Sequence, residues 1–363
     1  MNWDIFCNVV DNYGDIGVSW RLARQLACEY GMNVRLWVDD LESFIRLCPE
    51  GAHVDSQRLK GVEVRRWVSP FPEAIPGEVV IESFGCTLPE SFVGKMASME
   101  KKPVWINLEY LSAEEWVEDC HLMPSPRPPL VKHFFFPGFA RKTGGLILER
   151  DLFERRREFR QGWEAAYWRE KGIVPDGRMK ISLFCYENSA LETLLESWAV
   201  GDEAILCLVP EGRVSEAVKH FLGNGSNSKG NLEVGFIPFV EQEKYDLLLW
   251  ACDINFVRGE DSFVRAQWAQ KPFVWQIYPQ EEGAHLQKLD AFLDKYCRTL
   301  SVPSSDAVRR MWAAWNGMDN MGDAWAPFSN VRAELEVHGA AWAEEISGNN
   351  LASNLVDFVS GKR

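Results

Sequence analysis

The hydrophobic positions of the first forty residues follow two periods in turn, and together they predict a β–α–β unit. An apolar run at 3–10 is typical of a buried strand and leads into the turn-rich loop DNYGDIG at 11–17. Apolar residues then recur with helical spacing through 18–30, and Gly31 provides a C-terminal stop. Because a second strand-like run follows at 33–40, this order implies a parallel sheet with a right-handed crossover.

The same alternation continues along the chain and predicts two doubly wound α/β domains. Strand-like runs of the first half lie at 62–68, 78–83, 102–108 and 132–139. A second series, interrupted by helical segments, lies at 178–187, 204–210, 231–240, 253–257 and 271–278. We therefore expect an N-terminal Rossmann-like domain at 1–170 and a second one at 171–347, and the return of the last helix, 348–363, to the first domain stays open.

Two Rossmann-like domains of this kind are expected to face each other with a ligand cleft between them. Nine of the twelve residues at 149–160 are charged with mixed sign, so this segment is expected to be a solvated helix that connects the domains. Ligands are expected at the carboxyl ends of the parallel strands. Since several enzyme classes share this layout, the residues at those strand ends must decide the function.

Composition and charge exclude several classes of protein. The 363 residues are 46% hydrophobic and 25% charged, as in a soluble globular protein, and no apolar run reaches the roughly 18 residues that span a bilayer. A net charge of −14 argues against nucleic acid as the main partner and is compatible with a basic protein partner. Nine cysteines and six histidines are scattered without CxxC or HExxH spacing, so we expect reduced thiols, a cytoplasmic location and no zinc site.

The loop after the first strand carries the first candidate chemistry. Gly14 and Gly17 lack the full G-x-G-x-x-G pattern, so the loop offers little for a dinucleotide. Asp11 and Asp15 would lie at the carboxyl end of the strand, where acids can bind a cation or act as a general base. The alternative interpretation is that Asp15 only caps the following helix. Glu109, at another strand end, is a third candidate acid, with capping or solvent exposure as its alternative.

The segment at 255–270 is the second candidate, again a strand that runs through a tight turn into a helix. Glu260, Asp261 and Ser262 would lie at the helix start, where backbone N–H groups and the helix dipole favour a bound phosphate. Arg258 could add a charge-assisted contact, and Glu260 could bind a sugar hydroxyl. A plain N-cap without a ligand is the alternative interpretation.

Aromatic residues near the expected strand ends could stack on a nucleobase, namely Phe184, Tyr186, Phe239 and Tyr278. The chain has 16 Trp, 21 Phe and 8 Tyr, so core packing is the alternative at each of these positions. Stacking and core packing both stay open from the sequence.

Four segments of the chain are distinctive: VVDNYGDIGVSWRLARQLA at 9–27, NLEYLSAE at 107–114, FFFPGFARKTGGL at 134–146 and the long segment at 237–280. Together they resemble the elongation factor P arginine rhamnosyltransferase family. The resemblance runs through most of the chain in matching order. It implies a bacterial inverting glycosyltransferase of the GT-B type that transfers rhamnose from dTDP-β-L-rhamnose to one arginine of translation elongation factor P, without a metal ion or another cofactor.

The resemblance also implies a role for each candidate residue. Asp11, Asp15 and Glu260 would be catalytic, with Asp15 the base, and Glu109 would join the two aspartates in binding the acceptor. Residues of the second domain would hold the nucleotide sugar: Arg258, Glu260, Asp261 and Ser262 at the diphosphate and sugar, and Phe239, Gln242, Tyr186 and Tyr278, with Phe184 beside them, at the nucleotide.

Other hypotheses stay open alongside this one. A GT-B transferase or epimerase that acts on a small sugar acceptor would use the same phosphate site but would not need two acids for a guanidinium. A non-catalytic partner of elongation factor P would bind it without sugar turnover, and a dehydrogenase would be stabilised by NAD.

Overall fold

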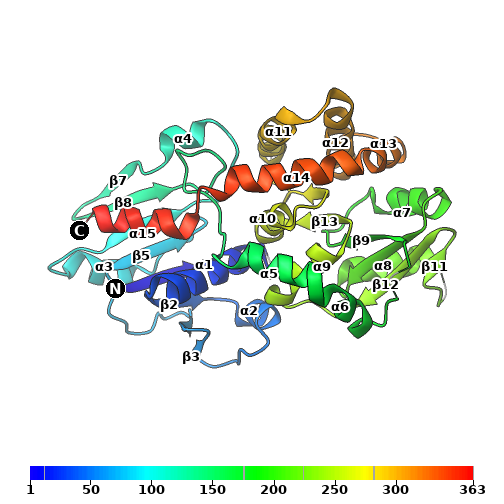
Figure 1. Cartoon of the computed structure of the whole chain (residues 1–363). Coiled ribbons are helices and arrows are strands. Elements are labelled where there is room, and N and C mark those ends of the chain that lie inside the picture. The colour runs from blue at the N-terminus through cyan, green and yellow to red at the C-terminus, as the bar shows by residue number, and fades with distance from the viewer. Residues whose placement is uncertain (12, 175, 224, 281–282, 363) are drawn as a thin grey trace. The chain divides into compact units, whose positions relative to one another are not determined.

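The computed structural model describes residues 1–11, 13–174, 176–223, 225–280 and 283–362 of the chain (Figure 1). The chain divides into two units. Unit 1 comprises Met1–Arg150 together with the C-terminal segment from Ile346, and unit 2 comprises Asp151–Glu345. The sequence analysis placed the corresponding boundaries at 170 and 347.

Unit 1 is built on an eight-stranded sheet with the strand order β3-β4-β2-β1-β5-β6-β8-β7. Its strands are β1 (Asn2–Cys7), β2 (Asn33–Val38), β3 (Ser56–Leu59), β4 (Val62–Arg66), β5 (Val79–Ser83), β6 (Val104–Leu108), β7 (Pro124–Arg127) and β8 (Leu130–Phe135). Its helices are α1 (Gly14–Tyr30), α2 (Leu41–Leu47), α3 (Glu90–Ser98), α4 (Trp116–Cys120) and α15 (Leu351–Gly361). The strands from β4 to β8 in this order are all parallel, which confirms the predicted parallel sheet.

The two edge strands of this sheet, β3 and β7, were not predicted. Each pairs antiparallel with its neighbour, β3 with β4 and β7 with β8, and so forms a hairpin at one edge. Their sequences, SQRL and PSPR, have no apolar alternation, because edge strands of this length bury little. The predicted runs at 62–68 and 132–139 correspond to their hairpin partners.

Helix α1 shows how the first predicted unit folds. It buries Trp20, Leu22 and Leu26, each no more than 1% exposed, and it ends where Gly31, at a φ of +64°, donates its N–H to the carbonyl of Leu26. The helix begins at Gly14, four residues earlier than its apolar spacing indicated. The polar loop therefore passes directly into the helix at the carboxyl end of β1.

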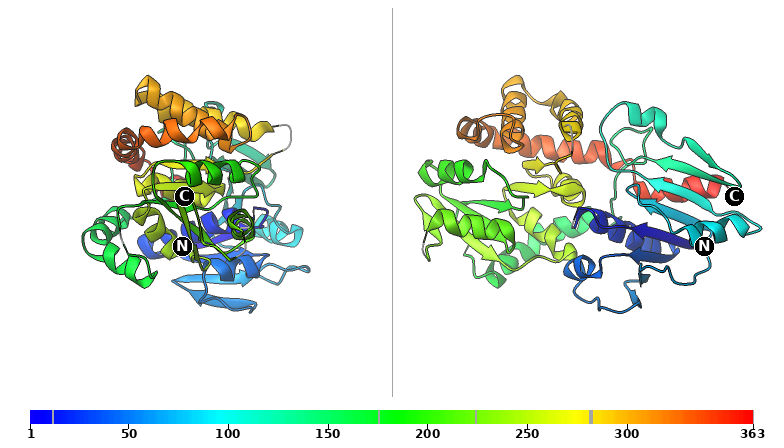
Figure 2. Two further views of the ribbon diagram at one scale, coloured as in Figure 1. Left: turned by 90° about the vertical axis from the view of Figure 1, so that its right-hand side faces the viewer. Right: turned by 180° about the vertical axis from the view of Figure 1, so that it is seen from behind.

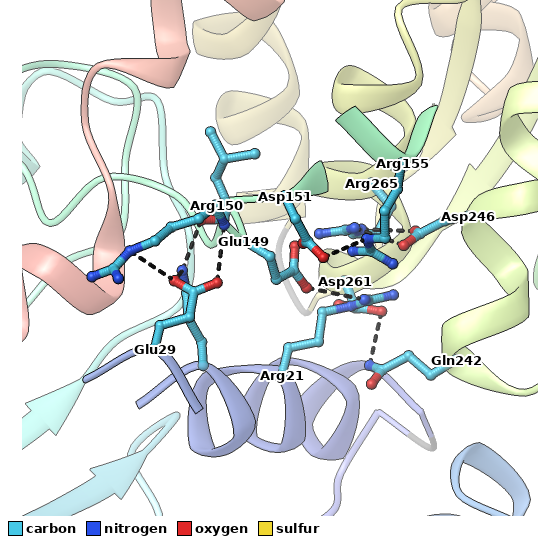
Figure 3. Close-up of polar contacts among 12 residues, drawn as sticks. Arg21, Glu29, Glu149, Arg150, Asp151, Arg155, Gln242, Asp246, Asp261 and Arg265 are labelled. Atoms are coloured by element: carbon cyan, nitrogen blue, oxygen red, sulfur yellow. Dashed lines mark hydrogen bonds and ion pairs between the residues drawn. The ribbon is translucent and has the colours of Figure 1, made fainter. Parts of the chain in front are cut away.

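Helix α1 also contacts residues 149 and 150, at which the chain leaves unit 1 (Figure 3). The guanidinium of Arg21, which is 2% exposed, pairs with Glu149 at 3.4 Å. At the next-to-last position of α1, the carboxylate of Glu29 accepts a hydrogen bond from the backbone N–H of Arg150 at 2.9 Å. These contacts fix the end of unit 1 to the helix that also begins at the polar loop.

The C-terminal helix α15 belongs to unit 1 and lies beside β8 (Figure 2). The ring of Phe358 contacts those of His133 and Phe135, with centroids 5.3 and 6.0 Å apart. A β-bridge between Leu146 and Asn350 fixes the start of the helix. The last helix therefore completes the core of unit 1, which was the point that the sequence left open.

Unit 2 contains a six-stranded sheet with the order β11-β12-β10-β9-β13-β14. Its strands are β9 (Met179–Leu183), β10 (Ile205–Pro210), β11 (Ser228–Lys229), β12 (Leu232–Ile237), β13 (Ile254–Arg258) and β14 (Phe273–Gln276), of which only β11 is antiparallel among the described pairings. Its longer helices are α7 (Leu191–Val200), α8 (Arg213–Leu222), α9 (Gln242–Ala251), α10 (Gly259–Ala269), α11 (Ala284–Tyr296), α12 (Val302–Trp315) and α14 (Arg332–Ser347). The strand runs predicted in the second series are confirmed.

Short helices complete unit 2. The charged stretch predicted at 149–160 forms α5 (Leu152–Glu158) and continues through a π-helical turn at Phe159–Trp163 into α6 (Glu164–Glu170). A further helix, α13 (Trp325–Asn330), and two 3₁₀ turns at Cys297–Thr299 and Met321–Asp323 lie toward the C-terminal part of the unit.

Each sheet reverses its strand order beside its first strand. In unit 1 the chain moves outward from β1 through β2 and β4, and then restarts on the other side of β1 with β5. In unit 2 the same reversal separates β9 from β13. Ligands of doubly wound sheets bind at this switch point, beyond the carboxyl ends of the strands, because the two flanking loops diverge there.

Candidate active site

The acidic loop of unit 1 lies at its switch point, directly after β1. Asp15 is 2% exposed, and its Oδ2 accepts hydrogen bonds from the backbone N–H groups of Val10 at 2.8 Å and Asp11 at 2.9 Å. The N-cap of α1 is Tyr13, which makes no side-chain capping bond. The interpretation of Asp15 as a helix cap is therefore wrong, because its carboxylate folds back onto the loop.

Burial raises the pKa of the Asp15 carboxyl above its ordinary value. The two backbone N–H groups and the hydroxyl of Tyr110 oppose this rise by hydrogen bonding to the carboxylate, and the negative charge of Asp39 adds to it. The net direction is upward. A carboxylate whose pKa is raised is a stronger proton acceptor, which is the property that a general base needs.

Asp11 lies over the start of α1. It is 8% exposed, and a Cβ placed on Gly14 would come within 2.4 Å of its Oδ2. The backbone N–H of Gly14 also donates to the carbonyl of Asp11 at 2.6 Å. A glycine is thus required at position 14 because the Asp11 carboxylate lies against its backbone. The presence of this glycine is explained without assuming that the loop binds a dinucleotide.

The end of β6 brings a third acid and a tyrosine to the same edge of the sheet. Glu109 is partly buried and accepts a hydrogen bond from the side-chain amide of Asn107. The next residue, Tyr110, stacks on Phe84 with the ring centroids 4.8 Å apart and an angle of 25° between the planes. Sequence reasoning missed Tyr110, although its position directly after a candidate acid at a strand end was a usable signal.

The switch point of unit 2 gathers an arginine and three aromatic rings. The guanidinium of Arg258 lies over Phe184 at 4.6 Å and over Tyr186 at 4.4 Å, measured from its central carbon to the ring centroids. Tyr186 meets Tyr278 edge to face at 5.5 Å. The backbone N–H of Tyr186 donates to Gln276 Oε1 at 2.8 Å, so residues at or just after the ends of β9, β13 and β14 converge.

The start of α10 leaves its first N–H groups without a side-chain cap. The N-cap residue is Arg258, and Gly259 follows with a φ of +65°. Ser262 Oγ accepts from the N–H of Arg258 at 3.1 Å and donates to the carbonyl of the same residue, so it braces the turn and does not cap the helix. A plain N-cap by Asp261 or Ser262 is therefore excluded, and the helix start keeps the character of an anion site.

Two polar contacts, one helical turn apart, join α9 to α10 (Figure 3). Gln242 Nε2 donates to Asp261 Oδ2 at 3.2 Å. One turn further along both helices, Arg265 donates to Asp246 through Nε at 2.8 Å and through Nη2 at 2.7 Å. The two residues on each helix are four positions apart and therefore share one face of it, so both contacts lie between the facing sides of the helices.

The ion pair between Asp246 and Arg265 was not predicted from the sequence. Asp246 and Arg265 are 2% and 1% exposed, and each lies next to buried apolar residues of its helix, Asp246 between Tyr245 and Leu248 and Arg265 between Val264 and Ala266. A charged residue at an apolar helix position was the available signal, because such a charge is buried only when it is paired. Phe239 and Glu260, which were also predicted for this site, are partly buried.

The part of the chain that the structure describes contains free thiols, but no cluster of metal ligands and no membrane-spanning helix. The nine cysteines are all free thiols, and most of them are buried. No group of three or more His, Cys, Asp or Glu side chains in the described ranges could hold a metal ion. Within the same residues, every helix is too short or too polar to cross a bilayer.

Two doubly wound α/β units, each with polar side chains at its switch point, define a glycosyltransferase fold of the GT-B class. A solved trehalose-6-phosphate synthase from Burkholderia multivorans shares this fold, with a TM-score of 0.51 and 8% identity over 99% of this chain and 97% of that chain. A family model described as elongation factor P (EF-P) rhamnosyltransferase EarP matches residues 3–360. The chain belongs to this family.

Two relatives of higher similarity agree with the assignment. A protein-arginine rhamnosyltransferase of Pseudomonas putida is 48% identical, over 98% of this chain and 98% of the relative. A structure solved in a study of EarP-mediated arginine glycosylation of translation elongation factor EF-P is 36% identical, with a TM-score of 0.72 over 100% of this chain and 99% of that chain. The predicted fold class and the prediction of a glycosyltransferase are both confirmed.

Proposed function

We propose that this enzyme transfers rhamnose from dTDP-β-L-rhamnose to one arginine side chain of elongation factor P, with inversion at the anomeric carbon. The names of the family and of the relatives support this choice of sugar and acceptor. The observation that carries the proposal is the Asp15 carboxylate, which is buried at the switch point of unit 1 and has a raised pKa. A base of that kind suits a nucleophile that must lose a proton.

Unit 1 supplies the acceptor half of the reaction. A guanidinium has a pKa above about 12 and is a poor nucleophile while it is charged. Asp11, Asp15 and Glu109 can bind it through charge-assisted hydrogen bonds that hold its plane and localise its protons. Asp15 then takes one N–H proton while that nitrogen attacks the anomeric carbon.

Unit 2 supplies the donor half. The N–H groups at the start of α10, Arg258 and Ser262 would hold the diphosphate, and Asp261 and Glu260 would contact the sugar. The thymine ring would lie between Phe239 and Gln242, while Tyr186, Tyr278 and Phe184 would surround the rest of the nucleotide.

The bonds and charges of the transfer balance without a further reactant. The C–N bond forms as the bond from the anomeric carbon to the diphosphate oxygen breaks, and dTDP leaves with the electron pair. Attack from the face opposite the diphosphate inverts the configuration. Arg258 and the N–H groups of α10 stabilise the charge that develops on the leaving group, so the proposal assigns no role to a metal ion or cofactor.

The acceptor and the compartment fit the character of the chain. A net charge of −14 favours approach of a basic, arginine-bearing loop, and it disfavours nucleic acid as a partner. Nine free thiols suit the reducing cytoplasm, where a translation factor works. We therefore include a cytoplasmic location, without membrane attachment, in the proposal.

Intact-mass spectrometry of elongation factor P after incubation with the enzyme and dTDP-β-L-rhamnose tests the proposal directly. We expect a mass increase of one deoxyhexose that disappears when the acceptor arginine is replaced by lysine. Asp15→Asn is the matched enzyme variant: transfer should be lost, while dTDP-rhamnose affinity in calorimetry stays near that of the parent. If elongation factor P stays unmodified while dTDP-rhamnose still binds, elongation factor P is not the acceptor. A small sugar acceptor would then be the alternative.

A further inference from the structure

The end of strand β14 contacts several parts of the proposed nucleotide-sugar site in unit 2. The indole Nε1 of Trp275 donates to the carbonyl of Gly259, at the start of α10, at 2.9 Å. The next residue, Gln276, accepts the backbone N–H of Tyr186 at 2.8 Å. Two residues further on, Tyr278 meets the ring of Tyr186 edge to face at 5.5 Å. The conformation of residues 275–278 therefore affects both the α10 start and the loop after β9.

The side chain of Asn316 binds the outer side of this strand end. In the described sheet, β14 is an edge strand that pairs with β13 on one side. On its other side, Asn316 Nδ2 donates to the carbonyl of Trp275 at 2.9 Å, and Asn316 Oδ1 accepts from the N–H of Ile277 at 3.1 Å. A residue of a neighbouring parallel strand would make the same two bonds opposite Gln276. The side-chain amide thus takes the place of one residue of a further strand.

Helix α12, which carries Asn316 at its C-terminal end, is fixed to the same region. The carbonyl of Trp315 accepts a hydrogen bond from Asn188 Nδ2, in the loop after β9, at 2.9 Å. The buried ring of Trp315 packs edge to face on Phe256 of β13, with the centroids 5.0 Å apart. The support of Asn316 therefore contacts both β13 and the loop that carries Tyr186.

The end of α12 does not by itself require an asparagine at position 316. The φ of Asn316 is −98°, outside the left-handed region that favours asparagine or glycine at helix ends. Gly317 adopts that conformation instead, with a φ of +79°. The backbone N–H of Asn316 donates to the carbonyl of Trp312 at 3.0 Å, a bond that any residue other than proline can make. What distinguishes an asparagine here is its pair of bonds to β14.

We infer that Asn316 is a positioning residue for the nucleotide sugar, because it holds the peptide groups on both sides of Gln276. The inference rests on the proposed function, in which Tyr186 and Tyr278 bind the nucleotide. Gln276 lies opposite Arg258 in the register of β13 and β14, so movement of this strand end would displace Tyr278 from the arginine. Asn316 acts through the backbone of β14 and prepares the site before the nucleotide binds.

Asn316→Ala removes both bonds to β14. We expect the Kd of dTDP, measured by calorimetry, to rise by about tenfold. The KM for dTDP-rhamnose should rise by a similar factor, while kcat at saturating dTDP-rhamnose and the KM for elongation factor P stay at parent values. Contacts to the nucleotide are the same in the ground state and the transition state, so their loss changes KM and not kcat.

Asn320→Ala is the matched control. Asn320 also makes one bond of each kind, but within its own turn: Oδ1 accepts from the N–H of Gly322 at 3.0 Å, and Nδ2 donates to Asp323 at 3.0 Å. This variant should keep the parent Kd and both parent KM values. Asn316→Asp is a milder change, because it keeps the acceptor for Ile277 and loses the donor to Trp275, and it should raise the Kd of dTDP by less. It supplies the measurement if Asn316→Ala does not fold.

Hydrogen–deuterium exchange without substrates gives a readout that does not depend on turnover. We expect faster exchange over residues 273–278 and 184–190 in Asn316→Ala, and parent exchange there in Asn320→Ala. A parent Kd for dTDP in a folded Asn316 variant would overturn the inference, even if its melting temperature fell, and so would unchanged exchange in both segments. If the parent enzyme itself does not bind dTDP, the proposed function fails, and the exchange still decides whether Asn316 holds these segments.

Discussion

The buried pair of Asp246 and Arg265 allows a quantitative test of how unit 2 is held together one helical turn from Gln242 and Asp261, which are proposed to bind the donor. The two hydrogen bonds measure 2.8 and 2.7 Å, and the side chains are only 3% and 1% exposed. Removing one partner leaves the other charge buried without compensation, which costs about 3–5 kcal/mol. We therefore expect Asp246→Ala or Arg265→Ala to lower the melting temperature by about 6–20 °C, at about 2–4 °C per kcal/mol for a unit of this size.

An exposed pair in the same unit provides the matched control. Lys219 and Glu216 on α8 are also joined at 2.7 Å, but their side chains are 50% and 73% exposed. Because water screens such a pair, Lys219→Ala should cost about 0–1 kcal/mol. The two pairs have the same separation, so a difference between them measures burial and not distance.

Urea unfolding followed by tryptophan fluorescence and far-UV circular dichroism provides the free energies. The double variant Asp246→Leu with Arg265→Met should recover most of the loss, since two apolar side chains leave no unpaired charge. The reasoning would be refuted if either single alanine variant lost less than about 1 kcal/mol, or if the double variant lost as much as the sum of the singles.

Three further predictions concern single side chains. Phe239→Ala should weaken dTDP binding in calorimetry by the roughly 1–3 kcal/mol of a lost stacking contact, and unchanged affinity would argue against base stacking there. Gly14→Ala places a methyl group within 2.4 Å of Asp11 Oδ2, so transfer to elongation factor P should fall sharply while donor affinity is kept; parent activity would show that Asp11 has no fixed role. Burial lowers the pKa of His121 to about 4, and its Nδ1 accepts from the N–H of Phe136 at 3.1 Å. Because the unfolded chain binds this proton near pH 6.5 and the folded chain only near pH 4, stability should be lost as pH falls through this window, and the urea midpoint of His121→Asn should fall less steeply there.

The sequence predicted most of the fold because buried parallel strands and amphipathic helices leave strong periodic patterns. Runs such as 204–210 match β10 almost residue for residue, whereas β3 and β7 have no apolar alternation to detect. The start of α1 was placed four residues late for a related reason. Gly14 and Asp15 form the first turn of the helix, but neither is apolar, so the apolar period does not reach them.

The candidate site was predicted less completely, because sequence patterns identify residue types and not their partners. The spacing of Asp11 and Asp15 left helix capping open, and only the direction of the Asp15 carboxylate excludes it. Arg258 was recognised beside a predicted phosphate site, but the rings of Phe184 and Tyr186 around it come from the loop after β9, which is distant in sequence. Long-range contacts of this kind are set by sheet order, which local periodicity does not encode.

The neutrality of the groups that hold Asp15 has a consequence for an enzyme that acts on a guanidinium. Two backbone amides donate to the Asp15 carboxylate, and the charge of Asp39 adds to the rise of its pKa. A resident arginine or lysine would lower the pKa of the carboxyl by about 1–3 units and would compete with the substrate for its lone pairs. With neutral donors the carboxylate keeps a raised pKa and an unmet demand for a cation. In the proposed mechanism an arriving arginine supplies that cation, and the same contact would bring the nitrogen that loses its proton to Asp15, the proposed base.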